Sequence, residues 1–270
     1  MKPLMLPIHF FSETNTFATL ESYHTVKDLK LTMMKKLQFN LQRMPYYSLY
    51  EVCNKKDIVE ERFLDDNDKI VDMIAVWDKE KEEFYKRNES IEFKLYLKLQ
   101  LYYNYAETDI DTITMIYVQT AYEVNLGRFN LNEEKIISLA AIQLLANYGS
   151  NQDLVYQNLQ AITEKFIPFD KFALYPAVDW IQKIMESFSN TKPCSKLEAK
   201  INYLESLNTS PEFQSHQFIV KVIFILKKKY SQKLNANNAE KSYPEDCILA
   251  VKSKGISVLD MDRVKFNLIF

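Results

Sequence analysis

Glycine is scarce in this chain, which has only three glycines among its 270 residues. Gly127 and Gly149 each follow an apolar segment where a helix is expected to end, and Gly255 lies in an expected hairpin turn. No glycine remains for a phosphate-binding loop or a dinucleotide-binding turn, because both motifs need several glycines close together. The sequence therefore excludes these two classes of nucleotide-binding enzyme.

Cysteine and histidine are also rare, with three residues of each. Cys53, Cys194 and Cys247 are far apart and form no CxxC motif, so we expect no disulfide framework and no zinc site, and a reducing compartment. The three histidines show no metal-ligand spacing, and structural or surface roles are expected for them; they are His9, His24 and His216. The sequence therefore predicts no metal and no cofactor.

The acidic residues do not form a catalytic pair. Neighbouring residues on a strand point to opposite faces, so the pairs Glu60–Glu61 and Asp65–Asp66 cannot converge on one substrate. We expect these acids to form a solvated hairpin edge. The GxSxG motif of serine hydrolases is absent as well. No catalytic residue is predicted, and we expect a protein that is not an enzyme.

Long apolar runs and an excess of one charge are missing too. No run approaches the roughly 20 apolar residues that span a membrane, and the first residues, interrupted by Pro3 and Pro7, do not resemble a signal peptide. The formal net charge is -2, so nothing draws the whole chain to nucleic acid. The abundant Tyr and Phe side chains lack a basic stripe beside them and are expected in protein cores. These features predict a cytoplasmic protein without a nucleic-acid partner.

Residues 1–99 alternate between strand and helix patterns. The pattern predicts strands over residues 7–11, 16–20, 46–53, 58–64 and 91–99. A helix is expected after Thr25, where Asp28 has the spacing of a capping box, and another begins at Ile70 and continues through the charged segment KEKEEFYKR. The order strand, strand, helix, strand, strand, helix, strand is that of a ubiquitin-like roll.

Residues 100–208 read as helices. Two helices are expected between Asp109 and Gly149, the first capped by Thr108 or Asp109 and the second by Asn132. The second helix is apolar on most sides and should be buried. Further helices are predicted over residues 151–163, 175–188 and 195–207. This region is therefore predicted to be a helical lobe.

Strand patterns return in residues 209–270. Residues 218–226 are apolar on both faces and are predicted to form a central strand. Residues 247–251 and 256–259 are expected to form a hairpin, and residues 264–270 alternate as one more strand. With sheet-rich regions on both sides of the helical lobe, the fold class is α+β.

Three blocks of sequence resemble a FERM domain, and most of all the FERM domains at the ends of unconventional myosin tails. They are Tyr47–Trp77 with its EERFLDD run, Tyr117–Gly149 with its ending LLANYG, and Ile248–Asp260. Lys200, Tyr203 and Leu204 also fit a Lys-x-x-Tyr-Leu pattern that the family often carries in the last helix of its second lobe. The resemblance is weak between Gln152 and Lys192.

The resemblance implies a cloverleaf of three lobes. Residues 1–99 would form the ubiquitin-like roll, residues 100–208 a helical bundle similar to acyl-CoA-binding proteins, and residues 209–270 a sandwich similar to pleckstrin-homology domains. A complete sandwich of this kind is longer than the last range, so we expect an incomplete third lobe.

The resemblance also implies a non-catalytic module that docks cargo and takes part in motor autoinhibition, in the cytoplasm at the cytoskeleton or membrane cortex. Its partners would be the cytoplasmic tails of membrane or adhesion proteins, or the myosin head in cis. Alternatives are a membrane–cytoskeleton linker like talin or ezrin without a motor, the tail of a kinesin, and a small-ligand carrier. The bulky side chains of the two central helices argue against a carrier, because they should fill the helical lobe.

One charge run offers a candidate binding site. Lys227, Lys228 and Lys229, with Lys233 close behind, follow the apolar segment 218–226. They could bind anionic phospholipid or an acidic partner, with each lysine near a membrane contributing about 1 kcal/mol. The alternative is a solvated strand end whose lysines prevent aggregation.

Overall fold

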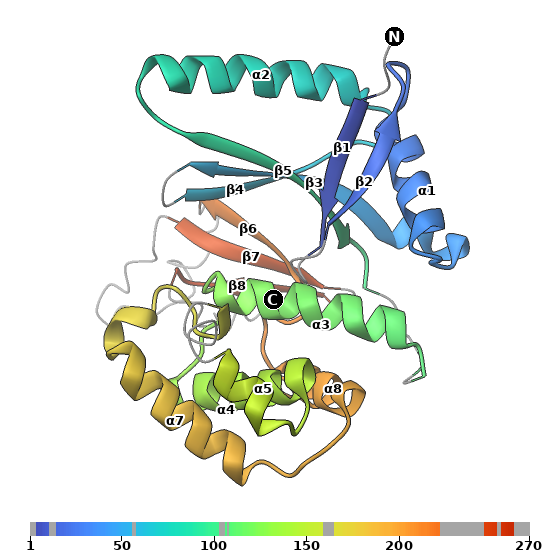
Figure 1. The fold of residues 1–270 in the computed structure, drawn as a ribbon. Helices are drawn as coiled ribbons and strands as arrows, with labels where there is room; N and C mark the ends of the chain where they lie inside the picture. Colours follow the sequence, from blue (N-terminus) through green and yellow to red (C-terminus); the bar gives the residue numbers. More distant parts are fainter. Residues whose placement is uncertain are drawn as a thin grey trace, which may run out of the picture. The chain divides into compact units, whose positions relative to one another are not determined.

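The computed structural model describes residues 4–10, 15–55, 58–102, 106, 108–158, 165–221, 246–252 and 255–261 (Figure 1). Two compact units make up the chain, Met1–Gln119 and Thr120–Phe270. The mixture of helices and sheets in both units confirms the α+β class. The expected lobe boundaries near residues 99 and 208 stay a prediction.

A five-stranded sheet organises the first unit. Its strands are β1 (Leu4–His9), β2 (Asn15–Leu20), β3 (Tyr47–Lys55), β4 (Ile58–Phe63) and β5 (Ile91–Leu99). The spatial order is β2-β1-β5-β3-β4, in which β1 and β5 run parallel and the other neighbours are antiparallel. Ile8 of β1 lies opposite Leu95 of β5. The central strand β5 therefore joins two hairpins, β1–β2 and β3–β4.

Helices α1 (Val26–Lys36) and α2 (Ile70–Lys86) and the short helix η1 (Leu41–Tyr46) complete the roll. The predicted capping box is present, because the Thr25 side chain accepts from the Asp28 amide and the Asp28 carboxylate accepts from the Thr25 amide. The buried face of α1 packs beside β2 and β3 and consists of Val26, Leu29, Lys30, Met33 and Met34. The predicted order of strands and helices in this region is confirmed.

One acid of the EERFLDD run is buried, although the sequence predicted that these acids are solvated. The EERFLDD acids were expected to be solvated, yet the Glu61 carboxylate is largely buried and lies 2.8 Å from the ammonium group of Lys98 on β5. Lys98 itself is only 5% exposed, and its ammonium group lies 4.8 Å from the centre of the Tyr50 ring. The prediction is therefore wrong for Glu61, because a cation on β5, which β3 separates from β4 in the sheet, makes burial of this carboxylate tolerable.

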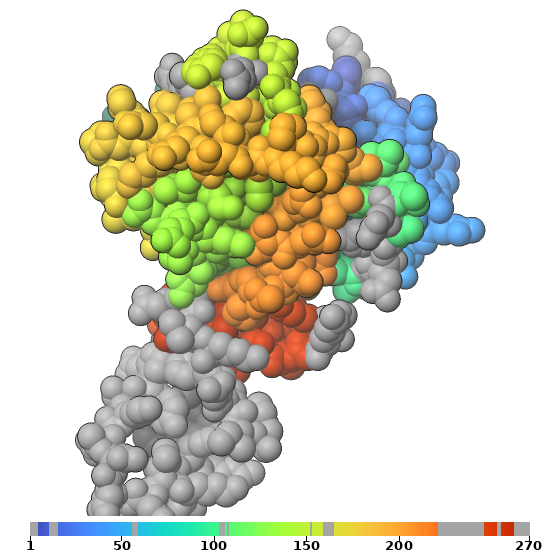
Figure 2. Space-filling view, turned by 90° about the horizontal axis from the view of Figure 1, so that it is seen from below, coloured from blue at the N-terminus to red at the C-terminus, as the bar shows by residue number. Residues whose placement is uncertain are grey.

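Helix α3 (Ile110–Asn125) runs from the first unit into the second. The second unit continues with α4 (Glu133–Tyr148), α5 (Gln152–Gln157), the short helix η2 (Phe172–Leu174), α7 (Ala177–Asn190) and α8 (Lys196–Leu207). The predicted α5 segment extends to residue 163, and its last part lies outside the described residues. Figure 2 shows the yellow-to-orange surface that α7 and α8 present on one side of this unit.

Helix α4 forms the centre of the helical cluster, with α7 and α8 packed against it. Asn132 caps its start by accepting from the Lys135 amide, and Gly149 ends it with φ +69°. Half of its residues are buried, namely Ile136, Leu139, Ala140, Ala141, Gln143, Leu144, Leu145 and Ala146. The predicted burial of this helix is confirmed.

Three antiparallel strands follow, β6 (His216–Lys221), β7 (Asp246–Lys252) and β8 (Gly255–Leu259), in the order β6-β7-β8. The predicted hairpin of β7 and β8 is confirmed. The prediction of a central strand at residues 218–226 is wrong for the part the structure describes, because β7 lies between β6 and β8 and Ile219 is 70% exposed. Residues 222–226 and the strand predicted over 264–270 lie outside the described residues.

Candidate functional site

Lys227, Lys228, Lys229 and Lys233 lie outside the described residues, beyond the end of β6. Their binding to anionic phospholipid or to an acidic partner stays a prediction.

The acidic residues of the first unit are held in separate interactions. Glu60 pairs with Lys55 at 2.8 Å, whereas Glu61 pairs with Lys98 on the other face of the sheet. Asp66 accepts two hydrogen bonds from the ammonium group of Lys30, at 2.7 and 2.9 Å, and Asp65 accepts from the amide of Asn67 in a turn. The members of each pair therefore point to different partners, and their arrangement offers no shared substrate position.

The histidines and cysteines of the described segments do not gather either. No group of three His, Cys, Asp or Glu side chains there could hold a metal ion. His9 lies beside the Tyr96 ring, and burial, together with the charge of Lys94, lowers its pKa. Burial raises the pKa of all three cysteine thiols, each of which is free. Within the same segments, no helix has the length and apolar character needed to cross a membrane.

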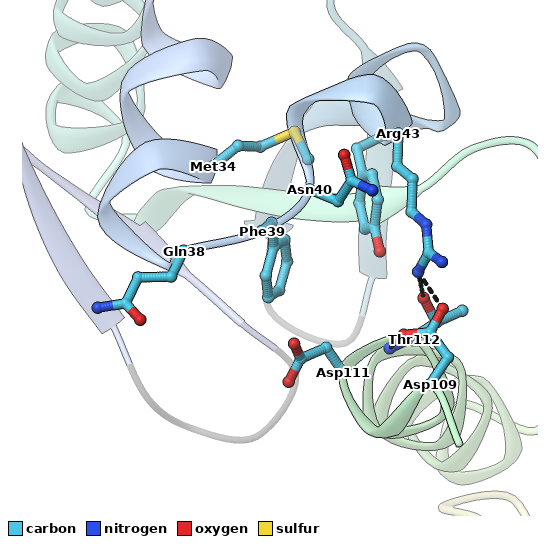
Figure 3. Close-up of a pocket in the computed structure, with 9 residues that line it drawn as sticks. Met34, Gln38, Phe39, Asn40, Arg43, Asp109, Asp111 and Thr112 are labelled. Carbon is cyan, nitrogen blue, oxygen red and sulfur yellow. Dashed lines mark hydrogen bonds and ion pairs between the residues drawn. The ribbon is translucent and has the colours of Figure 1, made fainter. Parts of the chain in front are cut away.

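A cavity of about 290 Å³ lies in the first unit, where the end of α1 meets η1, the start of β3 and the start of α3 (Figure 3). Its lining residues come from two stretches of sequence, Met34, Gln38, Phe39, Asn40, Arg43 and Tyr47 from one and Asp109, Asp111 and Thr112 from the other. Both stretches belong to the same compact unit. This cavity is the candidate binding site of the described residues.

The turn after α1 shapes one wall of the cavity. Gln38 adopts a left-handed conformation with φ +57°, and the amide of Phe39 donates to the Met34 carbonyl at 2.9 Å. Asn40 then caps η1 by accepting from the Gln42 amide at 3.0 Å. The chain reversal brings the Phe39 ring to 5.7 Å from the ring of Tyr47, which is 2% exposed. This wall is therefore aromatic and supported by tight local hydrogen bonding.

The start of α3 shapes the opposite wall. The carboxylate of Asp109 caps the helix by accepting from the Thr112 amide at 3.3 Å, which confirms one of the two predicted caps. The Arg43 guanidinium binds the same carboxylate and donates to the Thr112 hydroxyl at 2.8 Å. Burial would raise the pKa of Asp109, but the hydrogen bonds from Thr112 and the contact with Arg43 outweigh it and hold the pKa below its ordinary value of 3.8.

Asp111 faces the cavity in a different way. Figure 3 shows its carboxylate directed from α3 toward the Phe39 ring, while Arg43 turns to Asp109 and Thr112. The Asp111 side chain is exposed and has no hydrogen-bond or ion-pair partner among the described residues. The cavity thus combines an aromatic wall, a neutral Arg43–Asp109 pair and one uncompensated carboxylate.

Sequence reasoning did not find this cavity. Its two stretches are separated by most of the first unit, and Asp109 was interpreted only as a helix cap. The remaining local signal, acids at the start of an expected helix, is common to most helices. Only the folded sheet brings the end of α1 beside α3.

Two family models match successive parts of the chain. The RA-like domain matches residues 2–101, and the FERM central domain matches residues 106–218. The first range covers the five-stranded sheet and its helices, and the second covers the helices from α3 to α8.

Two curated relatives are motor proteins. Unconventional myosin heavy chain 6 of Caenorhabditis elegans is 23% identical over 175 residues, which cover 64% of this chain and 8% of the relative. The kinesin-like protein KIN-14I of Oryza sativa subsp. japonica is 25% identical over 229 residues, which cover 80% of this chain and 18% of the relative. The chain therefore spans less than a fifth of either relative.

Solved structures of similar fold match along almost the whole chain. The MyTH4-FERM MF2 domain of myosin VII from Dictyostelium discoideum has a TM-score of 0.69 at 17% identity, over 99% of this chain and 50% of that one. The C-terminal MyTH4-FERM domain of human myosin 7b, in complex with the harmonin-a PDZ3 domain, has a TM-score of 0.63 at 18% identity, over 98% of this chain and 52% of that one. The chain therefore has the fold of FERM domains, its residues 106–218 match the FERM central domain, and its sequence is similar to unconventional myosins.

Proposed function

We propose that the chain is a non-catalytic protein-interaction module in the tail of an actin-based myosin motor. The observation that carries the proposal is the FERM fold along 99% of the chain, matched by a myosin VII MyTH4-FERM domain. A related myosin 7b domain forms a complex with a PDZ domain, so a protein is the favoured kind of partner. The module would link the cytoskeleton to cytoplasmic tails of membrane or adhesion proteins, or would bind the motor head in cis, at the cytoplasmic side of the membrane cortex.

The arrangement of the acids supports a binding role. Glu60, Glu61 and Asp66 each pair with a different lysine, so their charges stabilise the fold instead of facing a substrate. A FERM module without chemistry of its own leaves ATP hydrolysis and actin binding to a motor head elsewhere in the protein.

The test is the size and actin behaviour of the native polypeptide. An antibody raised against residues 1–270 would be used on extract of the source cells, before and after actin pelleting with and without ATP. We expect a band far larger than the 31.9 kDa of this chain that pellets with actin and is released by ATP. A band near 31.9 kDa that is indifferent to nucleotide would contradict the motor and favour a linker of the talin or ezrin kind.

A kinesin tail is the second candidate, because the match to the kinesin-like relative covers 80% of this chain. The same extract would be pelleted with microtubules. A large band that pellets with microtubules, is released from them by ATP and does not pellet with actin would favour a kinesin tail over a myosin tail.

The lysine run would add an anionic surface as a further partner. We expect the triple variant Lys227→Glu, Lys228→Glu and Lys229→Glu to sediment less with vesicles that contain an anionic phospholipid. The matched control reverses three exposed lysines that lie far from the run in sequence, Lys27, Lys35 and Lys79. Equal sedimentation of both triple variants and the unaltered chain would favour solvated lysines that only prevent aggregation.

A further inference from the structure

We infer that the cavity between α1, η1 and α3 is a receptor for the guanidinium group of an arginine side chain on a partner peptide. The inference rests on the proposed function only in assuming that a protein carries this side chain. The occupant is identified by three features of the lining: its net charge, its aromatic wall and its free hydrogen-bond acceptors.

Charge favours a cation in the cavity. Three lining side chains are charged, and the ion pair between Arg43 and Asp109 neutralises two of them. Asp111 leaves a net charge of -1. The N-terminus of α3 opposes it with only about half a positive charge, and the Asp109 cap already lies against that end. A cation is therefore attracted, whereas an anion would meet Asp111 and find Arg43 already bound.

The aromatic wall favours a flat cation over a compact one. Phe39 is half-buried, and its ring packs against the buried ring of Tyr47. This packing fixes the position of the Phe39 ring. A planar guanidinium can stack on an aromatic face and still direct its N–H groups sideways to a carboxylate. Figure 3 shows the Asp111 carboxylate directed toward the Phe39 ring from the neighbouring helix. The Phe39 ring can therefore stack on the face of a guanidinium group, while the Asp111 carboxylate accepts the N–H groups in its plane.

The rim supplies further acceptors. Among the described residues, the side-chain amide of Gln38 has no hydrogen-bond partner, and its carbonyl can accept one N–H of a guanidinium. The carboxylate of Asp111 can accept two more in a parallel pair. A lysine ammonium has three donors but cannot make that planar pair, so arginine should bind more tightly than lysine. The volume of about 290 Å³ leaves room for the methylene stem beside Met34 and Phe39.

The experiment uses two short probes that differ by one functional group. Residues 1–270, labelled with ¹⁵N, are titrated with acetyl-Gly-Arg-Gly-amide and with the citrulline peptide of the same shape, which lacks the charge. We expect the arginine probe to shift the amide signals of Gln38, Asn40 and Asp111 in a saturable way at millimolar concentration. The citrulline probe should bind at least about tenfold more weakly, as loss of a charge-assisted hydrogen bond predicts.

Two variants locate the binding. Asp111→Asn should weaken the arginine probe about tenfold and reduce its preference over citrulline. Asp72→Asn is the matched control, because Asp72 is an exposed acid in the first turn of α2 in the same unit and does not line the cavity. It should leave binding unchanged. Amide spectra that keep their dispersion will show that both variants are folded.

Three results would overturn the inference: no saturable shift at the cavity, equal binding of the two probes, or equal weakening by the two variants. None of them bears on actin pelleting or on the size of the native protein. The experiments can therefore refute the arginine-binding inference and the motor-tail proposal independently of each other.

Discussion

The side-chain amide of Gln119 on α3 forms two hydrogen bonds with the backbone of Leu99 on β5. Its Oε1 accepts from the Leu99 amide at 3.0 Å, and its Nε2 donates to the Leu99 carbonyl at 3.2 Å and to the Tyr102 hydroxyl at 3.0 Å. The paired residues of β1 and β5 end at Tyr96, so beyond that point Gln119 takes the place of a neighbouring strand. One side chain thus satisfies two buried backbone groups.

Replacing Gln119 by Leu should destabilise the first unit by roughly 2–4 kcal/mol, because two buried backbone groups lose their partners at about 1–3 kcal/mol each. Urea unfolding would be followed by the fluorescence of Trp77, the tryptophan of this unit, in a Trp180→Phe background. Gln42→Leu is the control, since Gln42 lies in the same unit and its side-chain amide has no hydrogen-bond partner among the described residues. A Gln119→Leu variant as stable as that control would refute the role of this side chain.

Ionisation of Asp109 should make the first unit sensitive to acid. Its folded-state pKa lies below 3.8, so its contribution is present above that value and disappears as the pH falls through the folded-state pKa. Asp109→Asn keeps a capping side chain but weakens the contact with Arg43, and we expect it to cost about 1 kcal/mol at pH 7. Urea midpoints measured from pH 7 down to acid should show this gap closing, while an unchanged gap would contradict the prediction.

Gly127 and Gly149 offer a matched pair of backbone tests, because both have φ +69°. Alanine should cost roughly 1–3 kcal/mol at Gly149, where strain is the main effect because φ +69° with ψ -157° is a conformation that essentially only glycine adopts. The cost should be larger at Gly127, where an added Cβ would lie 2.8 Å from the Asp170 carboxylate. Adding Asp170→Ala to Gly127→Ala should reduce the cost to that of Gly149→Ala, as read from Trp180 fluorescence in a Trp77→Phe background. Equal costs for the two single variants would mean that Asp170 moves aside freely.

Gln38→Gly should stabilise the first unit by about 0.5 kcal/mol. Glycine relieves the left-handed strain at φ +57°, and the greater freedom of the unfolded chain offsets part of that gain. Asn88, with φ +59°, is the comparison, because asparagine adopts this conformation at lower cost and Asn88→Gly should be close to neutral. Denaturant midpoints of the two variants provide the measurement, and a destabilised Gln38→Gly variant would show that this side chain contributes contacts of its own.

Local patterns in the sequence predicted most of the described elements. The spacing of Thr25 and Asp28 predicted a capping box, and Asn132 and Gly149 bound an apolar stretch that became the buried helix α4. These features depend on residues a few positions apart, so a single sequence contains the information. For the same reason the strands of the first unit were predicted in their correct order along the chain.

Features that depend on distant residues were not predicted. Glu61 is buried because β5 places Lys98 beside it, and nothing near Glu61 in the sequence indicates that neighbour. The outer position of β6 among the described strands could not be predicted from its composition, since apolar side chains such as Ile219 occur on exposed strands as well as central ones. The cavity lined by Phe39 and Asp111 likewise exists only once α1 and α3 have been brought together.

The place of β5 in the sheet sets an order of events during protein synthesis. In the part of the sheet that the structure describes, the hairpins β1–β2 and β3–β4 are connected only through β5, whose residues leave the ribosome after all the others of the sheet. The pairing of Ile8 with Leu95 closes a loop of almost the whole unit, and such distant pairings form slowly. A nascent chain that stops before Ile91 lacks β5 and therefore holds two separate hairpins with unpaired inner edges, which is the stage most exposed to aggregation.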